Sequence, residues 1–381
     1  MKKKIRLSKS VVGLLEKKAL GKVIDDSYLG MGKYVEEFEH ELETYIGGGK
    51  VICVNSGTAA LHLALMGIGL VSGDEVLVQS LTFVACFQAI SAVGAVPVAC
   101  EVIPETCTID LKDAEKRITR KTKAIMPVHY AGRTGNLEEA YKFARKHGLR
   151  VIEDAAHAFG TLYKGKKVGS FGDVVCFSFD GIKNITSGEG GAVLTKDAKV
   201  AEFVMDARLL GVHKDTEKRY QGKRSWELNV FHQGYRYHMS NLFAAIGLSQ
   251  LKRFEKELKP SRQKLAKKYH SELSLINDIE LFPNDYDKVV PHIFPIKVTN
   301  GKRDGLRQYL MDNNIECGVH YYPNHLLKYY RKQKVRLPVT EKIYNELLSL
   351  PLHPDITDKD QKYIIEKIKG FLLNFKLTIL S

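Results

Sequence analysis

The sequence has no long hydrophobic run of the kind that crosses a membrane. Its most apolar stretch, residues 85–102, is interrupted by Gln88, Ser91 and Pro97, whereas a span needs about 20 consecutive apolar residues. The basic start Met1–Lys4 is not followed by the apolar segment of a secretion signal. We therefore expect neither a membrane segment nor a membrane partner.

Closely spaced cysteine pairs are also absent. The six cysteines are scattered, no two of them form Cys-x-x-Cys, and most lie in apolar runs, where a free cysteine behaves as a small hydrophobic residue. His320 and His325 have no acidic or cysteine companion at the spacing of metal ligands. The pattern predicts a reducing, cytoplasmic compartment and no metal site.

Acidic residues are fewer than basic ones, 44 against 58, which gives a formal charge of +14. An excess of this size favours an anionic partner, such as nucleic acid, a membrane surface or a phosphorylated small molecule. No RNA- or DNA-binding motif accompanies the short basic and aromatic segment Tyr329–Lys334, so we expect no nucleic-acid partner. The basic residues that could attract a small anion, although most could equally be solvated surface charges, are Lys214, Lys218, Arg219, Lys223, Arg224, Arg331 and Lys332.

Short apolar runs alternate with helical patterns between residues 50 and 200. Near-continuous apolar strands separated by helices are typical of a mostly parallel sheet that is covered on both faces. Helical periodicity covers Thr58–Leu70, Phe83–Val93 and Asn136–His147. The predicted strands are Val51–Val54, Glu75–Val78, Val96–Val102, Lys123–Val128, Leu149–Ile152, Val174–Phe179 and Ala192–Thr195.

The pattern changes after residue 229. A long helix from Ser240 to about Leu258 leads to Pro260, and strands and helices of mixed order follow. We predict a large α/β domain over residues 1–255 and a smaller α+β domain over residues 256–381. The charged stretch Lys214–Arg224 predicts a long exposed loop.

Two of the predicted strand ends carry polar residues suited to binding. Gly57 and Thr58 follow a strand at the start of a helix, where unpaired backbone N–H groups bind phosphate, although Asn55 or Ser56 could simply cap the helix. Asp154 ends another strand, where open α/β sheets bind ligands, although it could be a helix cap or a surface residue. His157, three residues on, could equally be a packed core histidine.

A third strand end carries a lysine between glycines, in the segment Ser178–Lys183 followed by Gly188–Gly191. A lysine amine with a lowered pKa can form an imine, and the glycines let the backbone close around a planar group. A phosphate site, an isolated carboxylate and such a lysine are together what pyridoxal 5′-phosphate (PLP) requires. Each signal alone is weak, and the combination predicts a PLP enzyme.

With these segments, the chain resembles the DegT/StrS nucleotide-sugar aminotransferases, which are fold-type-I PLP enzymes. The resemblance covers nearly the whole chain and implies that family's large, mostly parallel sheet domain and smaller C-terminal α+β domain. The matching segments are Gly32–Glu39, Asn55–Leu65, Leu81–Phe83, Glu153–Ala158, Ser178–Gly191, His320–His325 and Leu350–His353.

The resemblance also implies residue roles. Lys183 would hold the cofactor aldehyde and move a proton, and Asp154 would pair with the ring nitrogen. Phe83 would stack on the ring, and His157 would lie near its hydroxyl. The resemblance further implies phosphate binding by Gly57, Thr58 and Ser178, and substrate binding by His320 and His325.

By the same resemblance, glutamate would convert PLP to pyridoxamine 5′-phosphate (PMP), which would aminate a keto-deoxyhexose linked to a nucleoside diphosphate. The product would be an amino sugar for a surface polysaccharide, such as the O-antigen of lipopolysaccharide, or for another glycosylated product. The chain departs from the family at Arg236, where an Asn usually reaches the cofactor phosphate of the neighbouring subunit. Arg236 could bind that phosphate or the sugar nucleotide. The motif implies a homodimer with shared active sites.

Three other readings remain. A nicotinamide-dependent dehydrogenase needs Gly-x-Gly-x-x-Gly between the first strand and helix, and the chain has none there. A sugar dehydratase of the same fold works with PMP and without a lysine imine, so Lys183 argues against it. A non-catalytic regulator of the same fold would not need all the cofactor positions, which this chain keeps.

Overall fold

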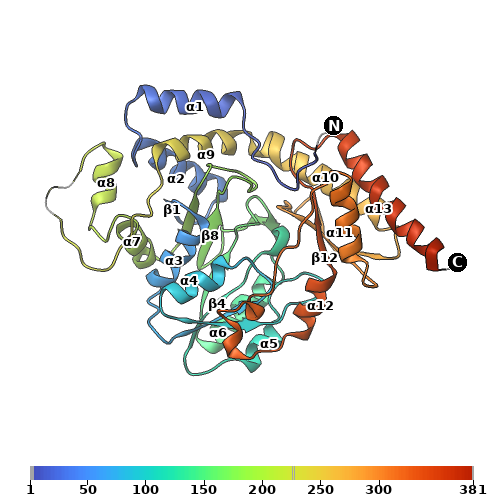
Figure 1. The fold of residues 1–381 in the computed structure, drawn as a ribbon. Coiled ribbons are helices and arrows are strands. Elements are labelled where there is room, and N and C mark those ends of the chain that lie inside the picture. Colours follow the sequence, from blue (N-terminus) through green and yellow to red (C-terminus); the bar gives the residue numbers. More distant parts are fainter. Residues whose placement is uncertain (1–3, 225, 227, 380–381) are drawn as a thin grey trace.

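The computed structural model describes residues 4–224, 226 and 228–379, and Figure 1 shows a large layered domain with a smaller domain beside it. Met1–Lys3, part of the basic start noted above, lie outside the described residues. In the part of the chain that the structure describes, no helix combines the length and the apolar character needed to cross a membrane.

A seven-stranded sheet forms the centre of the large domain. The strands pair in parallel except β9, which runs antiparallel to its neighbours β1 and β8. Each strand falls on a predicted apolar run, so the mostly parallel α/β sheet is confirmed. In spatial order the strands are β1 (Lys50–Val54), β9 (Gly191–Thr195), β8 (Val174–Ser178), β5 (Arg150–Asp154), β4 (Thr122–Met126), β2 (Glu75–Gln79) and β3 (Val96–Cys100).

Helices cover both faces of this sheet, which explains why its strands are apolar throughout. In β1, Ile52 and Val54 pack under one layer of helices, while Val51 and Cys53 pack under the other. The first layer contains α3 (Gly57–Gly67), α4 (Ala85–Ala92) and α7 (Ala198–Ala207). The second contains α2 (Lys33–Ile46), α5 (Leu111–Lys116), α6 (Leu137–His147) and α9 (Asn241–Arg253), and α1 (Leu14–Asp25) lies outside α9 (Figure 1).

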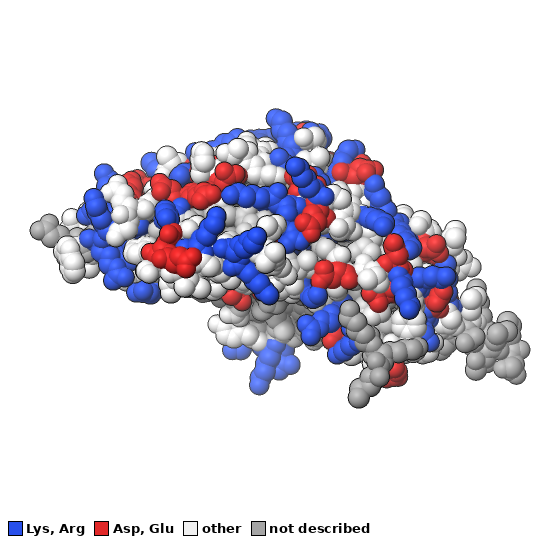
Figure 2. Space-filling model, turned by 90° about the horizontal axis from the view of Figure 1, so that it is seen from above, with Lys and Arg blue, Asp and Glu red and all other residues white. Residues whose placement is uncertain are grey.

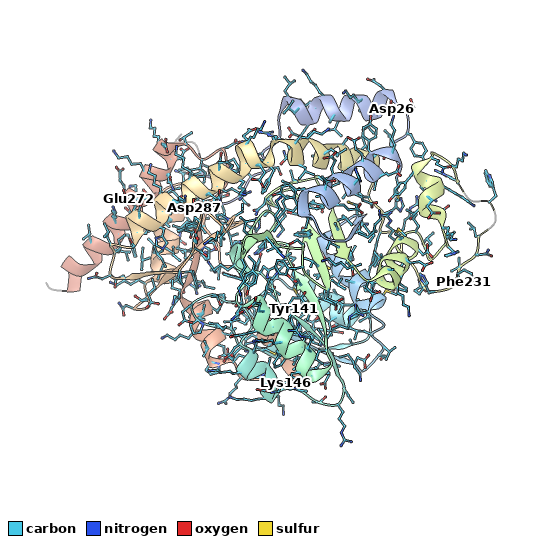
Figure 3. The ribbon with its side chains drawn as sticks, turned by 180° about the vertical axis from the view of Figure 1, so that it is seen from behind. Asp26, Tyr141, Lys146, Phe231, Glu272 and Asp287 are labelled. Atoms are coloured by element: carbon cyan, nitrogen blue, oxygen red, sulfur yellow. The ribbon has the colours of Figure 1, made fainter. Side chains whose placement is uncertain are left out.

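The smaller domain is built on a three-stranded antiparallel sheet, β10 (Ile279–Leu281), β11 (Phe294–Val298) and β12 (Leu347–Leu350). Its helices are α10 (Lys259–Leu273), α11 (Arg303–Asp312), α12 (Pro338–Glu346) and α13 (Asp358–Ile379). Glu272 and Asp287 mark this domain in Figure 3, at the opposite end of the molecule from Phe231. Smaller elements include β6 (Leu162–Tyr163), β7 (Lys166–Lys167), and the short helical turns Tyr130–Gly132, Asn324–Leu326 and Arg331–Gln333.

One continuous helical run joins the two domains. Helix α9 passes through a π-helical turn, Phe254–Leu258, directly into α10. Phe254 and Leu258 pack into the core of the large domain, and the core of the smaller domain begins at Leu265. At the other end of the chain, Ile5 pairs with Ile315 of the smaller domain. The division at residues 255/256 stays a prediction.

The charged stretch 214–224 is not wholly a loop, so that prediction is wrong in part. Residues Asp215–Tyr220 form helix α8, with Asp215 buried and its carboxylate 2.8 Å from Nε of Arg219. The hydroxyl of Tyr220 donates to Glu39 and accepts from Nη2 of Arg208 at 2.8 Å. One oppositely charged pair at i,i+4 and one anchoring tyrosine therefore turn a charged segment into a packed helix.

Candidate active site

A cavity of about 390 Å³ opens at the carboxyl ends of β5 and β8, the edge at which open α/β sheets bind ligands. Because these strands are neighbours and parallel, segments far apart in the sequence meet there. The structure brings together most of the predicted site residues. Those that line the cavity are Gly57, Thr58, Phe83, Asp154, His157, Ser178, Lys183 and His320.

The start of helix α3 forms one wall of the cavity. Ser56 caps the helix by accepting the N–H of Ala59 at 3.1 Å, so the capping role is real. Gly57 lies so close to β8 that a Cβ atom there would be 2.8 Å from Cβ of Ser178. The N–H groups of the first turn have no partner within the helix. This wall can therefore cradle an anion beside the Ser178 hydroxyl.

Asp154 lies at the base of the cavity. It is buried, and its Oδ1 accepts the N–H of Ala156 at 3.0 Å. The thiol of Cys86 donates to Oδ2 at 2.9 Å. These contacts fix the plane of the carboxylate while it lines the cavity. Asp154 is thus placed to accept a hydrogen bond from a protonated ring nitrogen.

Its neighbour Glu153 does not line the cavity, because successive residues of a strand point to opposite faces. Its Oε2 lies 2.7 Å from Nε2 of the buried His129, and its Oε1 accepts the hydroxyl of Tyr141 at 2.6 Å. Tyr141 belongs to α6 and is labelled in Figure 3. Strand alternation therefore decides which of the two consecutive carboxylates serves the site.

Lys183 lies in the turn that follows β8, where its N–H donates to the carbonyl of Asp180 at 3.0 Å. Burial lowers the pKa of its amine, and the positive charge of Arg262 adds to this, while Asp154 and Asp180 act in the opposite direction. The free amine is therefore more accessible than in an exposed lysine. This is the protonation state that attacks an aldehyde.

His157 is held as a neutral imidazole of one tautomer. Its Nδ1 accepts the N–H of Ala131 at 3.3 Å, so the ring proton sits on Nε2 and is donated to the hydroxyl oxygen of Tyr321 at 3.0 Å. Burial and the charge of Lys183 hold its pKa well below the ordinary value. The ring of Tyr321 lies 5.6 Å from that of Phe83. Tyr321 therefore keeps its own proton to donate.

Sequence reasoning missed other residues that line the cavity. Tyr321 lies within the family segment His320–His325, so the resemblance could have indicated it. Asp180 and Glu189 lie within the segment that contains Lys183. His292 had no signal, because it precedes a strand in an otherwise apolar run; its ring lies 4.4 Å from that of His157. Cys86, which lies outside the cavity lining and donates to Asp154, had none either.

Two histidines of the C-terminal signature have different surroundings. His320 lines the cavity, and its Nδ1 lies 2.8 Å from Oγ of Ser349; burial and Lys183 lower its pKa to about 4. His325 lies outside the cavity lining, buried between Oγ of Ser80 at 2.7 Å and Glu341 at 3.1 Å. Both of its ring nitrogens are engaged in these contacts, which is a packing arrangement.

Arg236 also lies outside the cavity lining of this chain. Its side chain is exposed, and its carbonyl oxygen accepts Nδ2 of Asn55 at 3.5 Å, near the start of α3. It therefore stands near the proposed phosphate wall but on the surface.

The residues present fit PLP. The start of α3 with Ser178 suits its phosphate, Asp154 suits its ring nitrogen, and Lys183 suits its aldehyde. The Cβ atom that is missing at Gly57 leaves the close approach that the phosphate wall needs.

Comparison with known proteins decides the family. Residues 13–369 match the DegT/DnrJ/EryC1/StrS aminotransferase family. The chain belongs to this family. It is therefore a PLP-dependent sugar aminotransferase, in which the cofactor alternates between PLP and PMP.

Three similar proteins illustrate the match. The chain is 34% identical to the spore coat polysaccharide biosynthesis protein SpsC of Bacillus subtilis, over 95% of each chain. It is similar to PseC of Helicobacter pylori, an aminotransferase involved in the biosynthesis of pseudoaminic acid, at 28% identity and TM-score 0.91, covering 98% of this chain and 100% of that one. It is also similar to the putative sugar aminotransferase Spr1654 of Streptococcus pneumoniae in its PMP form, at 27% identity and TM-score 0.92, covering 100% of both chains.

Proposed function

We propose that this enzyme takes an amino group from glutamate and delivers it to the keto group of a deoxyhexose linked to a nucleoside diphosphate. The main support for the proposal is that Lys183, Asp154 and the start of α3 line the same cavity. The product would be an amino sugar for a surface polysaccharide or another glycosylated product. Two relatives support this direction: SpsC is named as a spore coat polysaccharide biosynthesis protein, and PseC as an aminotransferase involved in the biosynthesis of pseudoaminic acid.

Each residue of the proposed site has a defined task. When bound, PLP supplies an electron sink for the bond being broken at the substrate carbon. Asp154 keeps the proton on the ring nitrogen, since a carboxylate stabilises that positive charge. Lys183 holds the aldehyde in the resting enzyme and then moves a proton with its free amine. Phe83 would stack on the ring, and His157 would lie near the ring hydroxyl while its two ring nitrogens contact Ala131 and Tyr321.

The remaining predicted residues bind the cofactor phosphate and the substrate. Gly57, Thr58 and Ser178 bind the phosphate through backbone N–H groups and hydroxyls. His320 stays neutral and contacts the substrate from the side of the smaller domain. We do not extend a substrate role to His325, because both its ring nitrogens have partners.

The substrate's negative charge would suit the basic surface. In Figure 2, lysine and arginine side chains lie between acidic ones over the face that contains α1, α9 and α10, so the excess charge on this face is spread out. Of the basic residues singled out above, Arg219 already forms an ion pair with Asp215. Any attraction for the nucleotide is therefore expected from the field of the whole protein.

We further propose that the enzyme acts in the cytoplasm as a homodimer, with Arg236 of each chain serving the other chain's site. The exposed position of Arg236 and its absence from its own cavity lining support this. Mixing Lys183→Ala chains with Arg236→Ala chains tests it. If Arg236 acts across the interface, the mixture regains about a quarter of the wild-type activity; if it acts within its own chain, no site in the mixture is complete.

The proposed reaction is tested with purified enzyme, glutamate and a panel of nucleotide-linked keto-hexoses, and the products are identified by mass and NMR. Glutamate alone should convert the bound PLP spectrum to that of PMP, and one sugar of the panel should then gain an amine. Borohydride should fix the cofactor at Lys183, with Lys183→Ala as the control. Fixation at another lysine, or no spectral response to any amino donor, contradicts the proposal.

A further inference from the structure

A buried arginine, Arg262, lies next to the cavity and contacts the turn that carries Lys183. Arg262 lies in the first turns of α10 and is 2% exposed. Its Nη1 donates to the carbonyl oxygens of His292 and Leu352, both at 3.3 Å. Its Nη2 donates to those of Ile182, at 3.5 Å, and Lys183, at 3.3 Å. Its partners are thus backbone groups of both domains.

Burying the charge of Arg262 at this position costs folding free energy. No carboxylate among the described residues forms an ion pair with it, and its Nε has no hydrogen-bond partner there. Burial alone lowers the pKa of its guanidinium to about 10. A buried charge without a counterion destabilises a fold unless other contacts compensate. An apolar side chain would avoid the cost of the buried charge but would leave four carbonyl oxygens without this donor, so the contacts that Arg262 makes decide its role.

The carbonyl oxygens that Arg262 holds belong mostly to the cavity. Ile182, Lys183 and His292 all line it. The next residue, Asn184, makes a second tie between the same segments, because its Nδ2 donates to the carbonyl oxygens of Phe159 and Val290, both at 3.2 Å. The backbone at Lys183 is therefore fixed to the segment that leads into β11.

We propose that Arg262 is a positioning residue of this aminotransferase: it holds the turn that carries Lys183 against the smaller domain and keeps a fixed positive charge beside its amine. The inference rests on the proposed role of Lys183. A guanidinium suits this task better than an ammonium group, because its planar fork reaches several carbonyl oxygens at once.

A fixed positive charge near an amine favours its neutral form. This agrees with the lowered pKa of Lys183, to which burial and Arg262 contribute. The charged and titratable groups that interact with Lys183 come from several elements. The groups that shift the pKa of Lys183 are Asp154, Asp180, Cys86 and Arg262. The charge of Lys183 in turn lowers the pKa of three histidines, His157, His292 and His320.

The test uses the cofactor-free protein, so that it does not depend on activity. Trace acetic anhydride labels amines in proportion to their neutral fraction, and the Lys183 peptide is quantified by mass spectrometry across a pH series. Arg262→Met should raise the pKa of Lys183 by half a unit or more, which lowers its labelling near neutral pH roughly threefold. Arg262→Lys, which keeps the charge, should leave the pKa closer to wild type.

Arg303→Met is the control: Arg303 is also a buried arginine that donates to backbone carbonyl oxygens, although it pairs with Asp304 as well. Its Nη1 donates to the carbonyl oxygens of Tyr344 and Leu347 at 3.0 and 3.1 Å, outside the cavity. This variant should lose stability while its Lys183 labelling curve stays unchanged. In the loaded enzyme, Arg262→Lys should lower kcat about tenfold and leave KM within about twofold, because the amine is less well placed.

An unchanged labelling curve in Arg262→Met, with a loss of stability like that of Arg303→Met, would overturn the inference. If Arg262→Met does not fold, an unchanged kcat in Arg262→Lys has the same consequence. Borohydride fixation in the wild-type enzyme separates the two proposals. Fixation away from Lys183 refutes the proposed function, whereas fixation at Lys183 with an unaltered curve refutes the role of Arg262 alone.

Discussion

Replacing Gly57 by alanine tests the phosphate wall of the active site directly. The added Cβ would lie 2.8 Å from Cβ and 3.1 Å from Oγ of Ser178, closer than side-chain atoms normally approach. Ser178 ends β8 and is buried, so it cannot simply rotate away. Either the start of α3 or the end of β8 must move, and both are proposed to bind the phosphate.

The expected size of the effect follows from this overlap. Overpacking by one carbon atom costs about 1–3 kcal/mol, while alanine in place of glycine in a helix returns up to about 1 kcal/mol. The cost is divided between the stability of the cofactor-free protein and the affinity for PLP. If most of it falls on binding, the dissociation constant of PLP rises about tenfold, since 1.4 kcal/mol corresponds to a factor of ten.

A double-mutant cycle isolates the contact. Ser178→Gly removes the atom that the new Cβ would meet, so Gly57→Ala should destabilise the cofactor-free protein less in that background. We expect a coupling free energy of about 1 kcal/mol, measured by urea unfolding. Gly21→Ala is the control, since a Cβ at Gly21 in α1 meets nothing within 4 Å; it should be neutral or stabilising. Additive effects together with unchanged PLP affinity would refute the close contact between α3 and β8.

Three further predictions test other parts of the molecule. Asp154→Asn should lower kcat roughly a hundredfold or more while PLP affinity changes much less, because a neutral partner does not keep the ring nitrogen protonated; equal turnover in a steady-state assay would remove Asp154 from this role. His320 has a pKa of about 4 in the folded protein and about 6.5 when unfolded, so the unfolded chain binds more protons and stability falls as pH falls from about 6.5 toward 4. By linkage the loss is about 2 kcal/mol at pH 5, and urea unfolding of His320→Asn should show a flatter pH dependence. Tyr220→Phe should cost about 1–3 kcal/mol in the same assay, because the buried Glu39 loses a hydrogen bond; a neutral result would mean that α8 is not anchored.

The fold was largely predictable because its central strands are buried on both faces. Their continuous apolar runs mark each strand to within a few residues, as at Glu75–Val78, which becomes β2 (Glu75–Gln79). The antiparallel direction of β9 had no signal, since a strand's direction leaves no trace in its own residues. Helix α8 was missed because its Tyr220 is anchored by residues outside the helix. Glu39 lies in α2, far away in the sequence, and Arg208 lies at the end of α7.

The site residues also fall into those that the sequence predicts and those that it does not. Residues that occupy strand ends, such as Asp154, could be predicted from the sequence, because the carboxyl ends of parallel strands converge on one edge of the sheet. Of the residues that the smaller domain supplies, His320 was predicted, but only through the family resemblance, since nothing in the local sequence fixes how that domain docks. His292 and Arg262 occupy ordinary positions before a strand and within a helix, and only the fold brings them to Lys183.

This difference bears on how the site works. The cofactor contacts predicted from the sequence come from the large domain, whereas His292, His320 and Tyr321 approach the cavity from the C-terminal part of the chain. Arg262 joins the two sets through the carbonyl oxygens of Lys183 and His292. A displacement of the smaller domain would therefore move the backbone at Lys183 together with the histidines around it. In the proposed role of Arg262, the placement of the Lys183 amine and the position of the smaller domain's histidines are therefore linked through one guanidinium.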